Sequence, residues 1–158
     1  MAVVRCDVME LGKTSHSSYK IRYHMVTAVK YRKALLNQDV EECIKETMAG
    51  ISERYEIAID EIGFDQNHIH IFCGSHPSMS PMKILGIIKS ITARRIFERF
   101  PKIKKRELWG GAFWSVGKYI GTVGEATNEK VVKRYIRNQS VDKPDAQNRL
   151  KQLKLFKI

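Results

Sequence analysis

The sequence lacks the features that carry a chain into a membrane. No apolar run approaches the roughly 20 residues that a membrane-spanning helix needs. A signal-peptide pattern is also missing, because Met1–Cys6 is followed by Asp7, Glu10 and Lys13. These absences predict a cytoplasmic protein with no membrane partner.

Cysteine and acidic residues are also few. Cys6, Cys43 and Cys73 have neither metal-binding nor disulfide spacing, and the apolar faces that carry Cys43 and Cys73 predict buried free thiols. The 17 acidic residues are outnumbered by 28 lysines and arginines, which gives a net charge of +11. Such an excess favours a polyanion such as nucleic acid as the partner, with a merely well-solvated surface as the alternative.

One stretch alternates regularly between polar and apolar residues. This pattern, over residues 63–73, is typical of a half-buried strand. Ile69 and Ile71 then point to one face, while His68 and His70 point together to the other. Two imidazoles about 7 Å apart at their Cα atoms form half of a metal site, although such a pair also occurs as ordinary polar surface.

A second pair lies in a stretch with helical periodicity. Tyr135 and Gln139 are four residues apart, so a helix places both on one face. A phenol can attack phosphorus, and a carboxamide oxygen can bind a hard cation. Taken alone, Tyr135 equally fits an amphipathic core residue and Gln139 a solvated helix end.

The order of the predicted elements indicates an α+β fold. Strand, helix, strand, strand, helix, strand is the order of a ferredoxin-like antiparallel sheet with two helices on one face, here with an added C-terminal helix that carries Tyr135. We interpret residues 1–158 as one domain with a leader (1–18), a core (19–139) and a basic tail (140–158). The expected elements are the strand Tyr19–Lys30, the helix Gln38–Tyr55, the strand Ile57–Phe64, the histidine strand, the helix Pro81–Phe100 and the strand Leu108–Val123.

Several basic residues are candidates for contacts with nucleic acid. Clustered cations beside an aromatic residue suit phosphate and base contacts. A solvated surface explains such charge runs equally well. The candidates are Lys30 and Arg32 at the end of the first strand, Arg94 and Arg95 on the second helix, and Lys104 and Lys105 in the loop after it.

Four further residues have two interpretations each. His24, on the first strand, fits an ordinary polar position of the sheet better than a place beside the metal site. Trp109, Phe113 and Trp114 fit core packing, with base stacking as the alternative.

Five segments match a known family in order and spacing, from about residue 17 to residue 139. They are Lys30–Arg32, Asn67–His70, Leu108–Gly111, Gly121–Gly124 and Tyr135–Gln139. With them the chain resembles the single-tyrosine HUH transposases of bacterial and archaeal insertion sequences (TnpA-type, IS200-like).

The resemblance implies a specific chemistry. Tyr135 would attack a DNA phosphate and hold the 5′ end as a phosphotyrosine, while His68, His70 and Gln139 would bind Mg²⁺ or Mn²⁺. The implied substrate is single-stranded DNA with hairpins at the element ends. The implied assembly is a homodimer with composite sites, in which His68 and His70 of one chain meet Tyr135 of the other.

One residue departs from the family pattern, and several rivals stay open. Asn67 stands where the family usually has aspartate, which leaves the orientation of His68 open. Tyr119 is a rival nucleophile, but it lies in a strand pattern with no glutamine four residues on. Rival functions are a non-catalytic or domesticated single-stranded nucleic-acid-binding protein on the same fold, and a replication initiator or relaxase, whose motifs are arranged differently.

Overall fold

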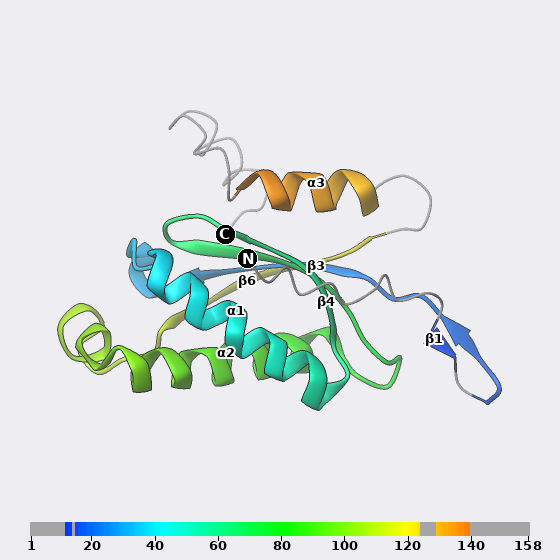
Figure 1. The fold of residues 1–158 in the computed structure, drawn as a ribbon, viewed down its shortest axis with the longest axis horizontal. Coiled ribbons are helices and arrows are strands. Elements are labelled where there is room, and N and C mark those ends of the chain that lie inside the picture. Colours follow the sequence, from blue (N-terminus) through cyan, green and yellow to red (C-terminus); the bar gives the residue numbers. More distant parts are fainter. Residues whose placement is uncertain (1–11, 14, 124–128, 140–158) are drawn as a thin grey trace.

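The computed structural model describes residues 12–13, 15–123 and 129–139 (Figure 1). The first eleven residues of the predicted leader and the basic tail at 140–158 lie outside these residues. Within the described part, no helix combines the length and the apolar character that crossing a membrane requires.

A four-stranded antiparallel sheet forms the centre of the structure. Its strands are β3 (Tyr23–Val29), β4 (Ala58–Phe64), β5 (His68–Gly74) and β6 (Trp114–Thr122). They lie in the order β4–β5–β3–β6, and every neighbouring pair is antiparallel. This order confirms the predicted ferredoxin-like arrangement, in which the first and third strands are central.

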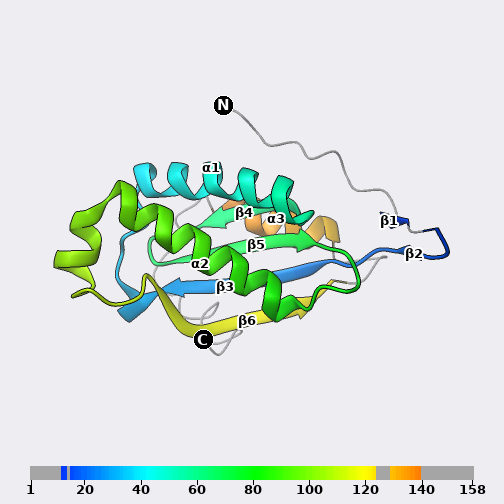
Figure 2. The same ribbon diagram turned by 90° about the horizontal axis from the view of Figure 1, so that it is seen from below.

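The helices lie on both faces of the sheet. Helices α1 (Gln38–Tyr55) and α2 (Pro81–Arg99) pack side by side over one face, and α3 (Glu129–Gln139) lies over the other (Figures 1 and 2). The helix that carries the predicted nucleophile is therefore separated from the other two by the sheet.

Side-chain caps explain where α1 and α2 begin. The Asn37 side chain accepts a hydrogen bond from the backbone N–H of Val40 (3.0 Å), and Ser80 Oγ accepts one from the backbone N–H of Lys83 (3.2 Å). Pro81 occupies the first turn of α2, where its missing N–H has no cost. Both helices begin where the sequence predicts.

The core lies between the sheet and the layer of α1 and α2. It is built from the apolar residues of the alternating strands and from the inner stripe of each helix. Cys43 and Cys73 are buried there as free thiols, as predicted. The core includes Met25, Ile69 and Ile71 of the sheet and Ile44, Met48, Ile84 and Ile88 of the helices.

The first strand is shorter than predicted. It begins at Tyr23 rather than at Tyr19, because β2 (Ser18–Tyr19) leaves the sheet and pairs with β1 (Gly12–Lys13) in a small separate hairpin. Part of the predicted leader (1–18) therefore belongs to a β-hairpin.

The last strand of the sheet also begins later than predicted. Leu108 is buried, but it follows η2 (Ile103–Glu107), a π-helical segment that replaces the predicted basic loop. Trp109 (φ 47°) and Gly110 (φ 77°) then form a left-handed turn, and β6 begins only at Trp114. Sequence periodicity does not reveal such a turn, because tryptophan rarely adopts a positive φ.

Candidate active site

Strand β5 places the two predicted metal ligands next to each other on the face of the sheet that α3 covers. Their ring centroids are 5.1 Å apart, and His70 is almost fully buried whereas His68 is half-buried. Ile69 and Ile71 point into the core on the opposite face. The alternation of β5 thus separates a polar pair from the core, as the sequence predicts.

Each of these histidines has a hydrogen-bond partner at Nδ1. His68 Nδ1 lies 2.8 Å from Asn67 Oδ1, and His70 Nδ1 lies 3.0 Å from Nε2 of His24. An amide oxygen only accepts, so His68 carries its proton on Nδ1 and keeps a lone pair on Nε2. If Nδ1 of His70 likewise donates to His24, Nε2 of His70 also keeps its lone pair. Partners of this kind orient metal-binding histidines.

These contacts answer two questions that the sequence left open, namely what Asn67 does beside His68 and where His24 lies. Asn67 uses its amide oxygen where the resemblance predicts a carboxylate. His24 is not an ordinary polar residue of the sheet, because it is buried and stacks on His70 with ring centroids 5.2 Å apart. The contact is diagonal, since the residue opposite His24 is Phe72. Only the register of β3 against β5 reveals it.

Burial favours the neutral form of His24 and His70. It lowers the pKa of His24 from 6.5 to about 4. The pKa of His70 lies well below its usual value, chiefly because of burial and further because positive charge on His68 and His24 would repel a proton. A neutral imidazole is the form that binds a metal ion.

A β-bulge in β4 positions α3. Asp60 is an extra residue, because its neighbours Ile59 and Glu61 pair with consecutive residues of β5. The bulge turns two successive carboxylates to the face that α3 covers. There Lys133 Nζ lies 3.9 Å from Asp60 Oδ2, and Arg137 Nε lies 3.0 Å from Glu61 Oε1. The two cations are four residues apart and so lie on one side of α3.

Helix α3 brings Tyr135 to the histidine pair. The ring centroids of Tyr135 and His70 are 5.6 Å apart, and the rings are nearly perpendicular. The Tyr135 hydroxyl oxygen is buried and has no hydrogen-bond partner among the described residues. Burial, and then the negative charge of Asp65, raises the pKa of Tyr135 above 10. A cation bound at the histidines would oppose both effects.

The donor atoms suit a divalent cation with open coordination positions. In the described part of the chain, no group of three or more His, Cys, Asp or Glu side chains could hold a metal ion. His68 and His70 therefore need a donor of another kind. The predicted one, Gln139, is the last residue of α3, and its side chain lies outside the described part. Two imidazoles and a carboxamide would accept Mg²⁺ or Mn²⁺, and also Zn²⁺, Co²⁺ or Ni²⁺.

The tyrosine and both histidines meet within one chain. The resemblance predicts that Tyr135 reaches the histidines of a second chain. The link at 124–128, which would allow that exchange, lies outside the described residues. The homodimer with composite sites therefore stays a prediction.

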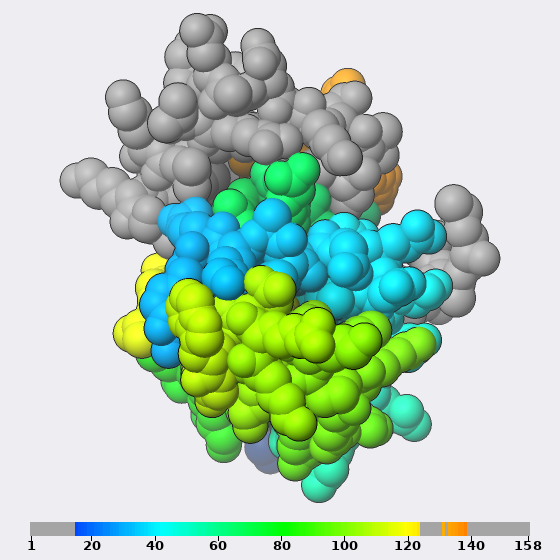
Figure 3. All heavy atoms as spheres, turned by 90° about the vertical axis from the view of Figure 1, so that its left-hand side faces the viewer, coloured from blue at the N-terminus to red at the C-terminus, as the bar shows by residue number. Residues whose placement is uncertain are grey.

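Four of the six basic candidates gather at one end of the sheet. Lys30 and Arg32 lie in η1 (Lys30–Arg32), and Lys104 and Lys105 lie in η2. These two segments are adjacent on the surface, where Figure 3 shows the blue and yellow-green parts of the chain side by side. The backbone N–H just before η1 donates to the carbonyl of Asn67 (2.8 Å), so this end of the sheet is the one that carries His68.

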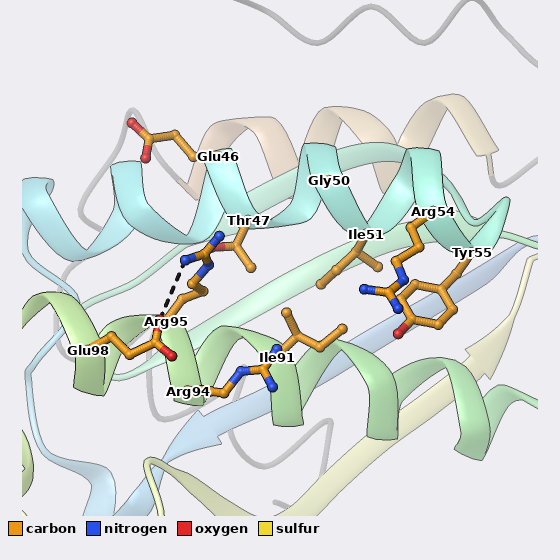
Figure 4. Close-up of a pocket in the computed structure, with 10 residues that line it drawn as sticks. All are labelled: Glu46, Thr47, Gly50, Ile51, Arg54, Tyr55, Ile91, Arg94, Arg95 and Glu98. Carbon is orange, nitrogen blue, oxygen red and sulfur yellow. Dashed lines mark hydrogen bonds and ion pairs between the residues drawn. The ribbon is translucent and has the colours of Figure 1, made fainter.

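The structure does not bring the other two basic candidates to the histidines. Arg94 and Arg95 lie on α2, across the sheet from α3, and line a hollow of about 380 Å³ between α1 and α2 (Figure 4). Arg95 forms an ion pair there with Glu98 (3.4 Å). Any DNA that they contact lies on the face away from Tyr135.

The close approach of α3 to β4 depends on a glycine. A Cβ at Gly63 would collide with the backbone carbonyl oxygen of Ile136 and approach its Cγ2 to 2.9 Å. We expect Gly63→Ala to displace α3 and to lower the rate of the DNA cleavage predicted for Tyr135 by roughly 100-fold, as an ångström-scale misplacement does. Faster amide exchange in α3 would report the displacement.

Gly86→Ala is the matched control, because a Cβ at Gly86 in α2 meets nothing within 4 Å. This change should leave the reaction unaltered and stabilise the protein by about 0.5–1 kcal/mol. Unchanged amide exchange and reaction rate in Gly63→Ala would show that α3 does not act from this position.

Known proteins resemble this chain in sequence. A model of the IS200-like transposase family matches residues 17–139. The ISDra2 transposase TnpA of Deinococcus radiodurans is 28% identical over 131 residues, which cover 83% of this chain and 92% of that protein. The transposase for insertion sequence element IS200 of Salmonella typhimurium is 26% identical over 125 residues, which cover 79% of this chain and 80% of the relative.

Two solved structures share the fold. A crystal structure of a protein assigned as a transposase from Deinococcus radiodurans aligns with a TM-score of 0.66 and 28% identity, over 82% of this chain and 98% of that one. The REP-associated tyrosine transposase bound to a REP hairpin aligns with a TM-score of 0.57 and 10% identity, over 79% and 73% of the two chains.

Proposed function

The chain belongs to the IS200-like family of DNA transposases, and we propose that it cuts and rejoins single-stranded DNA at insertion-sequence ends through a covalent phosphotyrosine. The observation that supports this chemistry is the position of the Tyr135 ring, 5.6 Å from that of His70. A potential nucleophile and a pair of metal-binding side chains thus lie together on one face of the sheet.

Tyr135 supplies the nucleophile. As its oxygen attacks phosphorus, the phenol loses its proton to water and the bond from phosphorus to the 3′ oxygen breaks. The 5′ phosphate stays on the tyrosine, and the 3′ end leaves as a hydroxyl after it takes up a proton. The 3′ hydroxyl of another DNA end then attacks the phosphotyrosine and releases Tyr135, so the bond energy is conserved and no ATP is needed.

His68, His70 and Gln139 would hold Mg²⁺ or Mn²⁺. When bound, the cation polarises the scissile phosphate and stabilises the charge on the leaving oxygen. Asn67 and His24 would orient the two imidazoles for this binding, through contacts of 2.8 Å and 3.0 Å at Nδ1 of His68 and His70.

The proposal includes the form of the DNA. The REP-associated tyrosine transposase is bound to a REP hairpin, which supports hairpin-ended single strands as the substrate of this chain. The net charge of +11 and the basic residues of η1 and η2 suit a phosphate backbone. A homodimer with two composite sites is part of the proposal: each Tyr135 would take, beside the histidines of the other chain, the place that it has here beside His70 of its own chain.

The test is to incubate the protein with single-stranded DNA that spans the ends of its own element, together with Mg²⁺ or Mn²⁺, and to run a denaturing gel. We expect a covalent protein–DNA band that EDTA abolishes. DNA binding without a covalent band in the presence of either metal would contradict the proposed chemistry. The protein would then be a non-catalytic single-stranded nucleic-acid-binding protein.

A further inference from the structure

Two large aromatic side chains are exposed next to each other at the end of the sheet. Tyr31 is 58% exposed and Trp109 is 71% exposed, with ring centroids 5.7 Å apart. The other tryptophan, Trp114, is buried and donates a hydrogen bond from Nε1 to Thr92 Oγ1 (2.9 Å). Burying side chains of this size normally stabilises the folded protein, so their joint exposure indicates a binding surface.

Both residues that carry these rings have an unfavourable backbone conformation. Tyr31 (φ 60°), Arg32 (φ 55°) and Trp109 (φ 47°) adopt left-handed backbone angles, and Glu56 is the one other non-glycine residue of the described part that does so. Left-handed angles are costly for residues with a Cβ, and such strain concentrates at functional sites. Here the strained residues meet at one surface.

Cations surround the two rings. Lys30 Nζ lies 5.2 Å from the centroid of Tyr31, and Lys33 Nζ lies 4.7 Å from that of Trp109. Lys33 also forms an ion pair with Glu107 (3.2 Å), which links the segment after η1 to η2. Exposed aromatic faces among cations are the combination that binds single-stranded nucleic acid, where bases stack on rings and phosphates pair with lysine and arginine.

The same segment is bonded to the turn that precedes His68. The backbone N–H of Val29 donates to Asn67 O (2.8 Å), and that of Leu36 donates to Gln66 O (3.1 Å). Residues 30–35 are therefore fixed at both ends against the β4–β5 turn. A strand of DNA with its cleaved phosphate at the histidines has its flanking nucleotides near this end of the sheet.

We propose that Tyr31 and Trp109 form a stacking platform for an unpaired base of the single strand that flanks the cleaved phosphate. This inference rests on the proposed function for the identity of the strand. The platform recognises a planar base and not the backbone alone, so it contributes an affinity that phosphate contacts do not supply.

The experiment measures fluorescence anisotropy with two labelled probes of equal length, oligothymidylate and an abasic sugar–phosphate strand, in EDTA so that no cleavage occurs. We expect Tyr31→Ala and Trp109→Ala each to weaken oligothymidylate binding by roughly 5- to 150-fold, which corresponds to the loss of one stacked base. Abasic-strand binding and its salt dependence should stay unchanged, because the phosphate contacts remain.

Two variants serve as controls. Tyr31→Phe keeps the ring and should retain wild-type binding. Val116→Ala removes an exposed apolar side chain of β6 (88% exposed) that has no ring and should have no effect. Circular dichroism on each variant shows that it is folded.

Three results would overturn the platform. These are equal weakening for both probes, unchanged binding of both probes, and a change from dimer to monomer on sedimentation of Trp109→Ala, which would make the surface a contact between protein chains. The covalent assay with the wild-type protein is independent of all three. A covalent band without base-dependent binding would contradict the stacking platform alone. Base-dependent binding without a covalent band would contradict the proposed chemistry alone.

Discussion

Tyr135→Phe is expected to abolish the covalent protein–DNA band and to lower strand cleavage by roughly 10³-fold or more, as removal of a nucleophile does. Phenylalanine keeps the ring against His70 and removes only the oxygen that we propose attacks phosphorus. That oxygen is buried without a hydrogen-bond partner among the described residues, so the variant should be at least as stable as the wild type. A denaturing gel and a thermal melt measure the two effects.

Tyr119→Phe is the control for this prediction. Tyr119 lies on β6 with its ring centroid 5.7 Å from that of His24, on the same face of the sheet. We expect Tyr119→Phe to form the covalent band at the wild-type rate. Loss of the band in Tyr119→Phe together with its retention in Tyr135→Phe would transfer the role of nucleophile to Tyr119.

His68→Ala is expected to weaken Mn²⁺ binding by roughly 100-fold or more, since loss of even an outer-shell partner costs about 10- to 100-fold. His68 is half-buried, so its truncation should leave the fold intact. Isothermal titration with Mn²⁺ measures the affinity without any DNA. In the covalent assay, His68→Ala should also lose the protein–DNA band.

The matched control is His76→Ala, in the exposed loop before α2. His76 Nδ1 lies 2.7 Å from Ser78 Oγ, and His76 follows the end of β5 opposite to the end that carries His68. This variant should bind Mn²⁺ like the wild type. If His68→Ala also bound Mn²⁺ normally, the cation would be held elsewhere and the assignment of the histidine pair would be wrong.

The sequence predicts the parts of the site that depend on local periodicity. The alternation of β5 predicts that His68 and His70 share a face, and the i, i+4 spacing predicts that Tyr135 and Gln139 share one. The strand and helix order then predicts the sheet. Each of these inferences needs only neighbours along the chain.

The features that the sequence does not reveal depend on contacts across the fold. The place of His24 requires the register of β3 against β5, and the contact of Lys133 on α3 with Asp60 requires the bulge at Asp60. Trp109 and Trp114 are close in sequence, yet one is exposed and the other buried. A left-handed turn separates their environments. Gly110 and Gly111 favour a bend here, but nothing in the sequence indicates that Trp109 itself adopts a positive φ.

The extra residue in β4 also bears on the position of Tyr135, the proposed nucleophile. Without the bulge, the side chains of Asp60 and Glu61 would point to opposite faces, and α3 would lose one of its two anchoring charges. A slide of α3 by one turn, about 5.4 Å, would separate both ion pairs at once and carry Tyr135 away from His70. Removing the extra residue from β4 would therefore disturb the active site, although β4 is an edge strand that carries no predicted catalytic residue.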